Sequence, residues 1–255
     1  MLTQNLPAHI VRQNAAPVPA IRVGRPPSTF LTGHPALVAT ESFYESKEEI
    51  YGESEPAEYV YQVVRGAVRT YKLLNDGRRQ IGAFHLPGDV FGLESGAEHR
   101  LTAEAIIETT VRVVKRRALE AVAKTDVRIA CELWTLTSGD LRHAEDHMLL
   151  LGRKTAAERV ATFLLEMDRR LSVAGMLSLP MCRRDIADYL GLTLETISRT
   201  LSILHARGVL ELSGARHITL RNRQRLATMG EVEVQGIEVC GGGGHSRNTG
   251  NGRRQ

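Results

Sequence analysis

Glu195, Ser198 and Arg199 are the side chains whose types and spacing best suit contacts with the edges of DNA bases. They are three and four residues apart, so in a helix they share one face. A carboxylate can accept a hydrogen bond from the cytosine amino group, and a guanidinium can donate two to guanine. The alternative is an ordinary helical hairpin in which Glu195 and Arg199 form a surface salt bridge.

The segment from Pro180 to Gly208 has the pattern of a helix-turn-helix. It contains two short apolar faces, made by Ile186, Ala187 and Leu190 and by Ile197, Leu201 and Leu204. The first helix is predicted to begin near Cys182. Gly191 can adopt positive φ in the turn, and Thr193 can cap the second helix. The pattern therefore places the three polar side chains near the start of the second helix.

A hairpin is predicted directly after the second helix. Residues 209–212 and 217–220 form its strands, around the turn Ser213-Gly214-Ala215. Residues 153–229 contain thirteen Lys and Arg against seven Asp and Glu, while the whole chain has a net charge of only +4. A winged helix-turn-helix with a local basic excess favours a polyanionic partner. We therefore expect residues 153–229 to bind double-stranded DNA.

The N-terminal half is predicted as an antiparallel β barrel. Short β-rich runs at 59–64, 67–74, 80–86 and 109–114 are separated by turns, of which Asn75-Asp76-Gly77 is a strong hairpin signal. Many short strands at this spacing are typical of a barrel or jelly roll. We expect an α+β fold with this barrel at residues 29–124. The Pro-rich residues 1–28 are predicted as a flexible arm, and the Gly-rich residues 230–255 as a disordered tail.

One long helix is predicted between the barrel and the helix-turn-helix, over residues 125–152. Its apolar side chains fall roughly on one stripe, at Ile129, Leu133, Leu136, Met148 and Leu151. We expect this stripe to form a dimer through a coiled coil. The alternative is a helix that packs along its own barrel.

Several other classes of protein are disfavoured. The sequence has no apolar run near the ~20 residues of a membrane span and no pattern of a secretory signal, so we expect a cytoplasmic protein without membrane contacts. Its three cysteines lie far apart in the sequence, which excludes a disulfide framework and metal-ligand spacing. No nucleophile–base set or P-loop is present, so we expect no enzyme activity and no metal site.

The segment from Leu192 to Arg199 resembles the recognition helix of the Crp/Fnr regulators. The order of barrel, long helix and winged helix-turn-helix matches their architecture over roughly residues 40–229. Met181-Cys182-Arg183-Arg184-Asp185-Ile186 is most similar to the FixK branch of this family. The resemblance implies a homodimeric transcription regulator, mainly an activator, of genes for microaerobic respiration, nitrogen fixation or denitrification.

The resemblance also implies how DNA and RNA polymerase are contacted. Glu195 and Arg199 would read a G·C pair and Ser198 the neighbouring thymine, in a palindrome of the TTGA-N6-TCAA type. Leu194 stands where family members that read TGTGA have an arginine, which favours the TTGA type. DNA backbone contacts would come from Arg183, Arg184, Thr193 and Thr196. RNA polymerase would be contacted by Asn75-Asp76-Gly77 and by residues 169–177.

Effector residues of the family are incomplete in this chain. Its cyclic-nucleotide members have a Gly-Glu pair for the ribose and an Arg-Ser or Arg-Thr pair for the phosphate. Within residues 91–102, Leu93 stands in place of that Glu, and Leu101 follows Arg100. The N-terminal arm has no cysteines for an iron–sulfur cluster, and His85 and His99 are isolated candidates for haem. We expect no cofactor and no effector; the alternative is a Crp-type regulator gated by a ligand in the barrel.

Cys182 is predicted to be a redox switch. It begins a helix next to Arg183 and Arg184, and both features favour thiolate over thiol. Its place in the family lies against the DNA backbone, where sulfinate or sulfonate would repel phosphate. The alternative is a small helix-starting residue without a redox role. Cys131 is expected to be a buried apolar residue, and Cys240 lies in the predicted tail.

Overall fold

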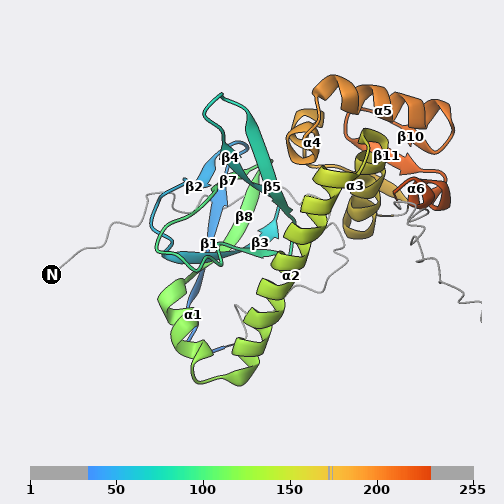
Figure 1. Cartoon of the computed structure of the whole chain (residues 1–255). Coiled ribbons are helices and arrows are strands. Elements are labelled where there is room, and N and C mark those ends of the chain that lie inside the picture. Colours follow the sequence, from blue (N-terminus) through green and yellow to red (C-terminus); the bar gives the residue numbers. More distant parts are fainter. Residues whose placement is uncertain (1–33, 172, 174, 231–255) are drawn as a thin grey trace, which may run out of the picture.

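The N-terminal part of the chain forms two antiparallel four-stranded sheets (Figure 1). The computed structural model describes residues 34–171, 173 and 175–230, so the predicted arm and all but the first residue of the predicted tail lie outside the described residues. One sheet has the order β1 (Ala39–Tyr44), β8 (Thr109–Lys115), β3 (Tyr59–Arg65), β6 (Val90–Phe91). The other has the order β2 (Glu49–Tyr51), β7 (Thr102–Ala105), β4 (Val68–Leu73), β5 (Arg79–His85).

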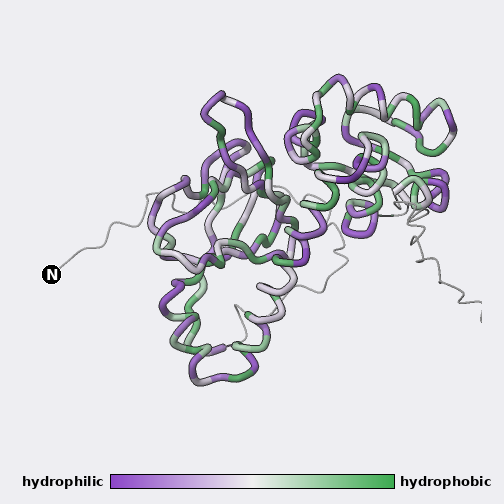
Figure 2. The backbone as a smooth tube through the Cα atoms, in the orientation of Figure 1, coloured by the Kyte–Doolittle hydropathy of each residue, from purple (hydrophilic) through white to green (hydrophobic). Residues whose placement is uncertain are grey.

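Apolar side chains from both sheets form the core of this domain. The cluster is composed of Tyr51, Tyr61, Val63, Val68, Phe91, Ala103 and Val111. Non-consecutive strands are neighbours in both sheets, as in a jelly roll. The predicted strands occur at β3, β4, β5 and β8, and the turn at 75–77 joins β4 to β5. This β4–β5 hairpin ends in a hydrophilic turn that projects from the sheet (Figure 2).

Two helices follow the sheets. The short helix α1 (Arg116–Ala123) was not predicted; its buried Leu119 and Val122 are too few to give a clear periodic signal. The long helix α2 (Val127–Arg153) begins where the Asp126 side chain accepts a hydrogen bond from the backbone N–H of Arg128. Its observed bounds are close to the expected 125–152. Figure 1 shows α2 running beside the sheets to the C-terminal domain.

The two faces of α2 have different partners. Ile129 and Leu136 are buried in the protomer's own core, which corrects their assignment to a dimer seam. Leu133 packs against the same cluster, and Leu151 packs against the C-terminal core, so of the five predicted seam residues only Met148 is largely exposed. Sequence periodicity found an apolar stripe that mostly faces the protomer, but it missed the outward-facing apolar residues Val127, Trp134 and Leu141.

A second apolar row on α2 lies on the opposite side of the helix. Val127, Trp134, Leu141 and Met148 are 75%, 76%, 61% and 65% exposed. They recur every seven residues, two positions before the buried Ile129, Leu136 and Leu150, and two positions correspond to about 200° around a helix. The helix therefore packs along its own barrel and also leaves a regular apolar row uncovered.

The C-terminal domain is a winged helix-turn-helix. It consists of α3 (Ala156–Leu171), β9 (Met176–Ser178), α4 (Arg183–Leu190), α5 (Leu194–Ala206), β10 (Leu210–Leu212), β11 (His217–Leu220) and α6 (Arg223–Gly230). The wing is a three-stranded sheet of order β10-β11-β9. Its hairpin was predicted, but β9 was not, because a strand of three residues gives little periodic signal.

Candidate nucleic-acid interface

The turn between α4 and α5 fixes the start of the second helix. Gly191 ends α4 with φ +60°, a backbone conformation that glycine adopts without strain. A Cβ at this position would also lie 3.4 Å from the side chain of Leu151. Thr193 caps α5: its hydroxyl accepts a hydrogen bond from the backbone N–H of Thr196 at 3.1 Å. Both local predictions from the sequence are present in the structure.

The predicted base-reading side chains lie on the first two turns of α5. Ile197, Leu201 and Leu204 face the core, which leaves Glu195 and Arg199 with side chains 70% and 76% exposed. Arg199 Nη2 lies 2.6 Å from Glu195 Oε1, and Ser198, between them in sequence, is partly exposed. The surface salt bridge expected under the alternative interpretation is therefore present. The same face of α5 is also exposed enough to contact DNA bases. In water such a pair is weak, so a base edge can replace either partner.

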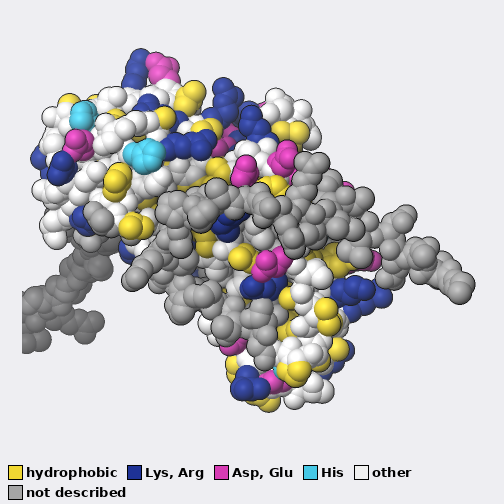
Figure 3. Space-filling model, turned by 180° about the vertical axis from the view of Figure 1, so that it is seen from behind, with side chains coloured by type: hydrophobic (Ala, Val, Ile, Leu, Met, Phe, Trp, Pro, Cys, Tyr) yellow, Lys and Arg dark blue, Asp and Glu magenta, His cyan; other side chains and the backbone are white. Residues whose placement is uncertain are grey.

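The residues predicted to contact the DNA backbone lie at the starts of α4 and α5. Arg184 and Thr193 are exposed, whereas Arg183 and Thr196 are partly buried. Arg183 Nε is buried without a hydrogen-bond partner in the part of the chain that the structure describes. Seen from behind, Lys and Arg side chains gather in the upper middle of the molecule, with Asp and Glu side chains beside them (Figure 3).

Cys182 is the N-cap residue of α4. It is a free, partly buried cysteine whose backbone N–H donates to Asp185 Oδ2 at 3.0 Å. Cys131 is exposed on α2 of the protomer, so the expectation that it is buried does not hold for the single chain. Cys240 lies outside the described residues.

Asp185 is a site residue that sequence reasoning did not single out. Its side chain is 5% exposed and accepts hydrogen bonds from the Cys182 backbone and from two arginines of the barrel, Arg69 and Arg79. Its place three residues after the N-cap was a local signal for the first of these bonds. Its partners in the barrel, more than a hundred residues earlier, give no signal in one sequence.

The residues predicted for RNA polymerase differ in accessibility. The turn at 75–77 is exposed. Within 169–177, Arg170 forms ion pairs with Asp89 and Glu166, and Leu171 and Leu177 are buried. This second segment therefore offers less free surface than its polarity indicated.

A cavity of about 680 Å³ separates β4 and β5 from α2. Thr70, Gly82, Leu101 and Met148 are among its lining residues, and the described lining contains no Lys or Arg. Arg100 is exposed and does not line it. A cyclic phosphate would therefore meet no guanidinium there.

The two candidate haem ligands are both hydrogen-bonded; His99 is buried and His85 is partly buried. His85 Nε2 lies 3.1 Å from Thr70 Oγ1, and burial lowers the pKa of His85 to about 4. His99 Nδ1 lies 3.0 Å from Glu94 Oε1, and its ring stacks on Tyr51. Over residues 34–171, 173 and 175–230, no cluster of His, Cys, Asp and Glu has the geometry of a metal site. Within the same residues no helix has the length and apolarity needed to cross a bilayer.

Two family models match this chain. Residues 158–229 match the Crp-like helix-turn-helix domain, and residues 41–126 match the cyclic nucleotide-binding domain. The first covers the winged helix domain, including α4, the turn and α5. The second covers both sheets and α1.

Curated relatives and solved structures agree with these matches. The chain is 47% identical to the nitrogen fixation regulation protein FixK of Azorhizobium caulinodans, over 75% of this chain and 79% of that protein. It is 43% identical to the protein of the same name from Rhizobium meliloti, over 76% and 88%. The solved structure of FixK2 from Bradyrhizobium japonicum is 74% identical, with a TM-score of 0.75, and the match covers 77% of this chain and 99% of that one.

Proposed function

Because this chain belongs to the FixK branch of the Crp/Fnr family of transcription regulators, we propose that it binds a TTGA-N6-TCAA-like palindrome as a homodimer and mainly activates transcription. The observation that carries the proposal is the exposed face of α5, where Glu195 and Arg199 stand on a helix fixed by the Gly191 turn and the Thr193 cap. Half-sites of such a palindrome lie roughly 10–10.5 bp apart, one turn of DNA.

Sequence-specific contacts are assigned to α5 and non-specific contacts to the helix starts. Glu195 and Arg199 would read a G·C pair, with Ser198 at the neighbouring thymine. Arg183, Arg184, Thr193 and Thr196 would contact phosphates, which fix the register of the protein on DNA. Selection of binding sites from random DNA tests this: recovery of sequences without TTGA half-sites would contradict the proposed target.

Dimer formation is assigned to the outward row of α2. Val127, Trp134, Leu141 and Met148 repeat every seven residues and are exposed in the protomer. This is the period at which two helices pack in a coiled coil. Isolated exposed apolar residues are normal on a protein surface, but a regular row of four along one helix is a pattern of helix–helix contact.

We further propose that the barrel acts without an effector and that Cys182 confers redox control. The cavity without Lys or Arg in its described lining supports the first, and the position of Cys182 at the start of α4 beside Arg183 and Arg184 supports the second. The alternative, a ligand-gated regulator, is favoured by the volume of the cavity, which is large enough for a small ligand. Measurement of DNA affinity with and without cyclic AMP distinguishes the two. We propose that RNA polymerase contacts the exposed turn 75–77 and, over a smaller surface, residues 169–177.

A further inference from the structure

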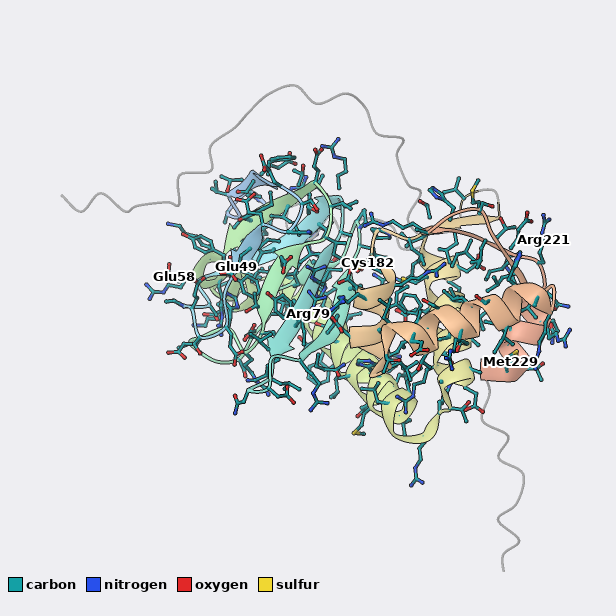
Figure 4. The ribbon with its side chains drawn as sticks, turned by 90° about the horizontal axis from the view of Figure 1, so that it is seen from above. Glu49, Glu58, Arg79, Cys182, Arg221 and Met229 are labelled. Atoms are coloured by element: carbon teal, nitrogen blue, oxygen red, sulfur yellow. The ribbon has the colours of Figure 1, made fainter. Side chains whose placement is uncertain are left out.

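Two arginines of the barrel hold the first helix of the helix-turn-helix. Arg69 Nη1 on β4 lies 2.9 Å from Asp185 Oδ1 on α4, and Arg79 Nη2 on β5 lies 2.7 Å from the same oxygen. Arg79 also donates to Asp188 Oδ2 through Nη2 at 2.8 Å and Nε at 3.0 Å. Seen from above, Arg79 and Cys182 lie where the strands of the barrel meet the helices of the C-terminal domain (Figure 4).

This contact is largely shielded from water. The side chains of Arg69 and Asp185 are 9% and 5% exposed, and Arg69 forms a second ion pair with Glu104 of β7. Charge-assisted bonds in such surroundings are short and directional. Removal of one partner leaves a buried charge without compensation, which is strongly unfavourable. The contact is therefore unlike the exposed pairs on this protein's surface, such as Asp76–Arg78.

The other end of α4 is held by backbone contacts. The carbonyl oxygen of Tyr189 is 3.3 Å from Gln80 Nε2 of β5 and 2.8 Å from His147 Nε2 of α2. Arg159 of α3 donates to the carbonyl oxygens of Leu190 and Leu151, at 2.9 Å and 2.7 Å. Both ends of α4 are thus tied to elements outside the helix-turn-helix, and the barrel contributes to each end.

A fixed α4 matters because α5 packs directly on it. Along the chain, the winged domain follows α2 after the short connection at Lys154 and Thr155, between α2 and α3. If that connection could bend freely, the two α5 helices of a dimer would not keep the spacing of one DNA turn that a palindrome requires. Once one α5 helix is bound to its half-site, the other has an effective concentration at the second half-site. This concentration falls when the connection is flexible or holds the domain in another orientation.

We propose that Arg69 and Arg79 are positioning residues for DNA recognition: through Asp185 and Asp188 they set the orientation of each winged domain, and thereby the half-site spacing that the dimer accepts. The proposal rests on the proposed function, since it presupposes a palindrome and a dimer. Neither arginine is proposed to contact DNA. Their effect is confined to the binding of two half-sites at once.

The test compares full palindromes with a single half-site. Arg69→Gln and Arg79→Gln each remove a cation from the contact, and Arg78→Gln removes the neighbouring exposed cation as a matched control. Fluorescence anisotropy measures binding to duplexes with the six-base-pair spacer, with spacers one pair shorter and one longer, and with one half-site only. We expect the Kd for the six-pair palindrome to rise about tenfold in both variants, as effective concentration falls. Half-site binding should stay within about twofold.

Loss of spacer preference is the readout that a general loss of stability would not produce. We expect the affinity ratio between the six-pair spacer and the altered spacers to shrink in Arg69→Gln and Arg79→Gln and to stay unchanged in Arg78→Gln. Tighter binding of the palindrome by either variant would overturn the proposal, because the contact would then be inhibitory. Equal weakening on half-site and palindrome would overturn it as well.

Exchange of the charges at positions 79 and 188 distinguishes loss of this ion pair from misfolding of a variant. Asp188→Arg should lose spacer preference through repulsion with Arg79, and the double variant Arg79→Asp/Asp188→Arg should regain part of it. Trypsin cleavage after Arg153 or Lys154 should be faster in Asp188→Arg than in the double variant, because that connection becomes mobile. No difference between the two proteins in either assay would overturn the proposal. Absence of half-site binding by the unaltered protein would instead contradict the proposed function.

Discussion

Among single side chains, Arg199 is the one whose loss best separates base reading from general DNA affinity. It is exposed and held only by Glu195 in the described structure, so its replacement removes no packing. We expect Arg199→Ala to cost about 1–3 kcal/mol at the consensus site and to relax the preference for G. Competition binding with single-base variants of the site measures both effects.

The matched control is Arg207→Ala, at the exposed C-terminal end of the same helix. This variant should leave the base preference intact. If Arg199→Ala weakened binding equally on every sequence, Arg199 would contact phosphate alone, and the assignment of base reading to it would be wrong.

Cys182 carries the prediction of redox control. Peroxide should weaken DNA binding of the unaltered protein, and Cys182→Ser should bind normally and resist peroxide, since serine cannot be oxidised in this way. Cys182→Asp should bind poorly even when reduced, most clearly at low salt, because its carboxylate faces phosphate. Serine and aspartate are both good N-cap residues, so α4 should form in both variants.

Electrophoretic mobility shift before and after peroxide checks these outcomes, with Cys131→Ser as the control for the exposed cysteine. Full sensitivity in Cys182→Ser would assign the response to Cys131 or Cys240. Normal binding by Cys182→Asp would show that the N-cap of α4 lies too far from the DNA backbone to act by charge.

At the level of elements, the outward row of α2 carries the prediction of dimer formation. Trp134 is the largest side chain in that row and is 76% exposed. Trp134→Glu should shift the protein to the monomer, because two carboxylates would meet in an apolar seam. Thr135→Glu, one residue on and outside the row, should remain a dimer. Sedimentation equilibrium measures the association constant; an unchanged constant in Trp134→Glu would place the interface elsewhere.

How far the sequence predicted each element depended on whether its signal was local. The helix-turn-helix was predicted closely because Gly191 and Thr193 act within their own turn. The strands β3 to β5 were predicted from short β-rich runs separated by turns, of which the turn at 75–77 is one. On α2 the expectation was partly wrong, because Ile129 and Leu136 fit a seam and a barrel contact equally well in one dimension. The link from Asp185 to Arg69 joins residues 116 positions apart and could not be predicted.

At the scale of the whole molecule, the predictions concern what the barrel does. The two sheets match the cyclic nucleotide-binding domain, yet the cavity between β4, β5 and α2 has no Lys or Arg in its described lining. His85, which lines it, has a pKa lowered to about 4 by burial, so it is neutral near pH 7 and cannot substitute for a guanidinium. The barrel instead contacts α4 directly through Arg69 and Arg79. A barrel of this kind can orient the winged domain without a ligand.

Effector independence is therefore tested on the full chain. The purified protein should bind its palindrome and activate transcription with RNA polymerase in the absence of nucleotide and metal. Cyclic AMP should change neither the Kd for DNA nor the melting temperature, because a ligand that does not bind the folded state cannot stabilise it. Leu101→Arg offers a positive test of the cause: it adds a guanidinium to the cavity lining, beside Gly82. If the missing cation is what excludes the phosphate, this variant should gain some thermal stabilisation from cyclic AMP. A tenfold rise in DNA affinity of the unaltered protein on addition of cyclic AMP would show instead that the cavity is a working effector site.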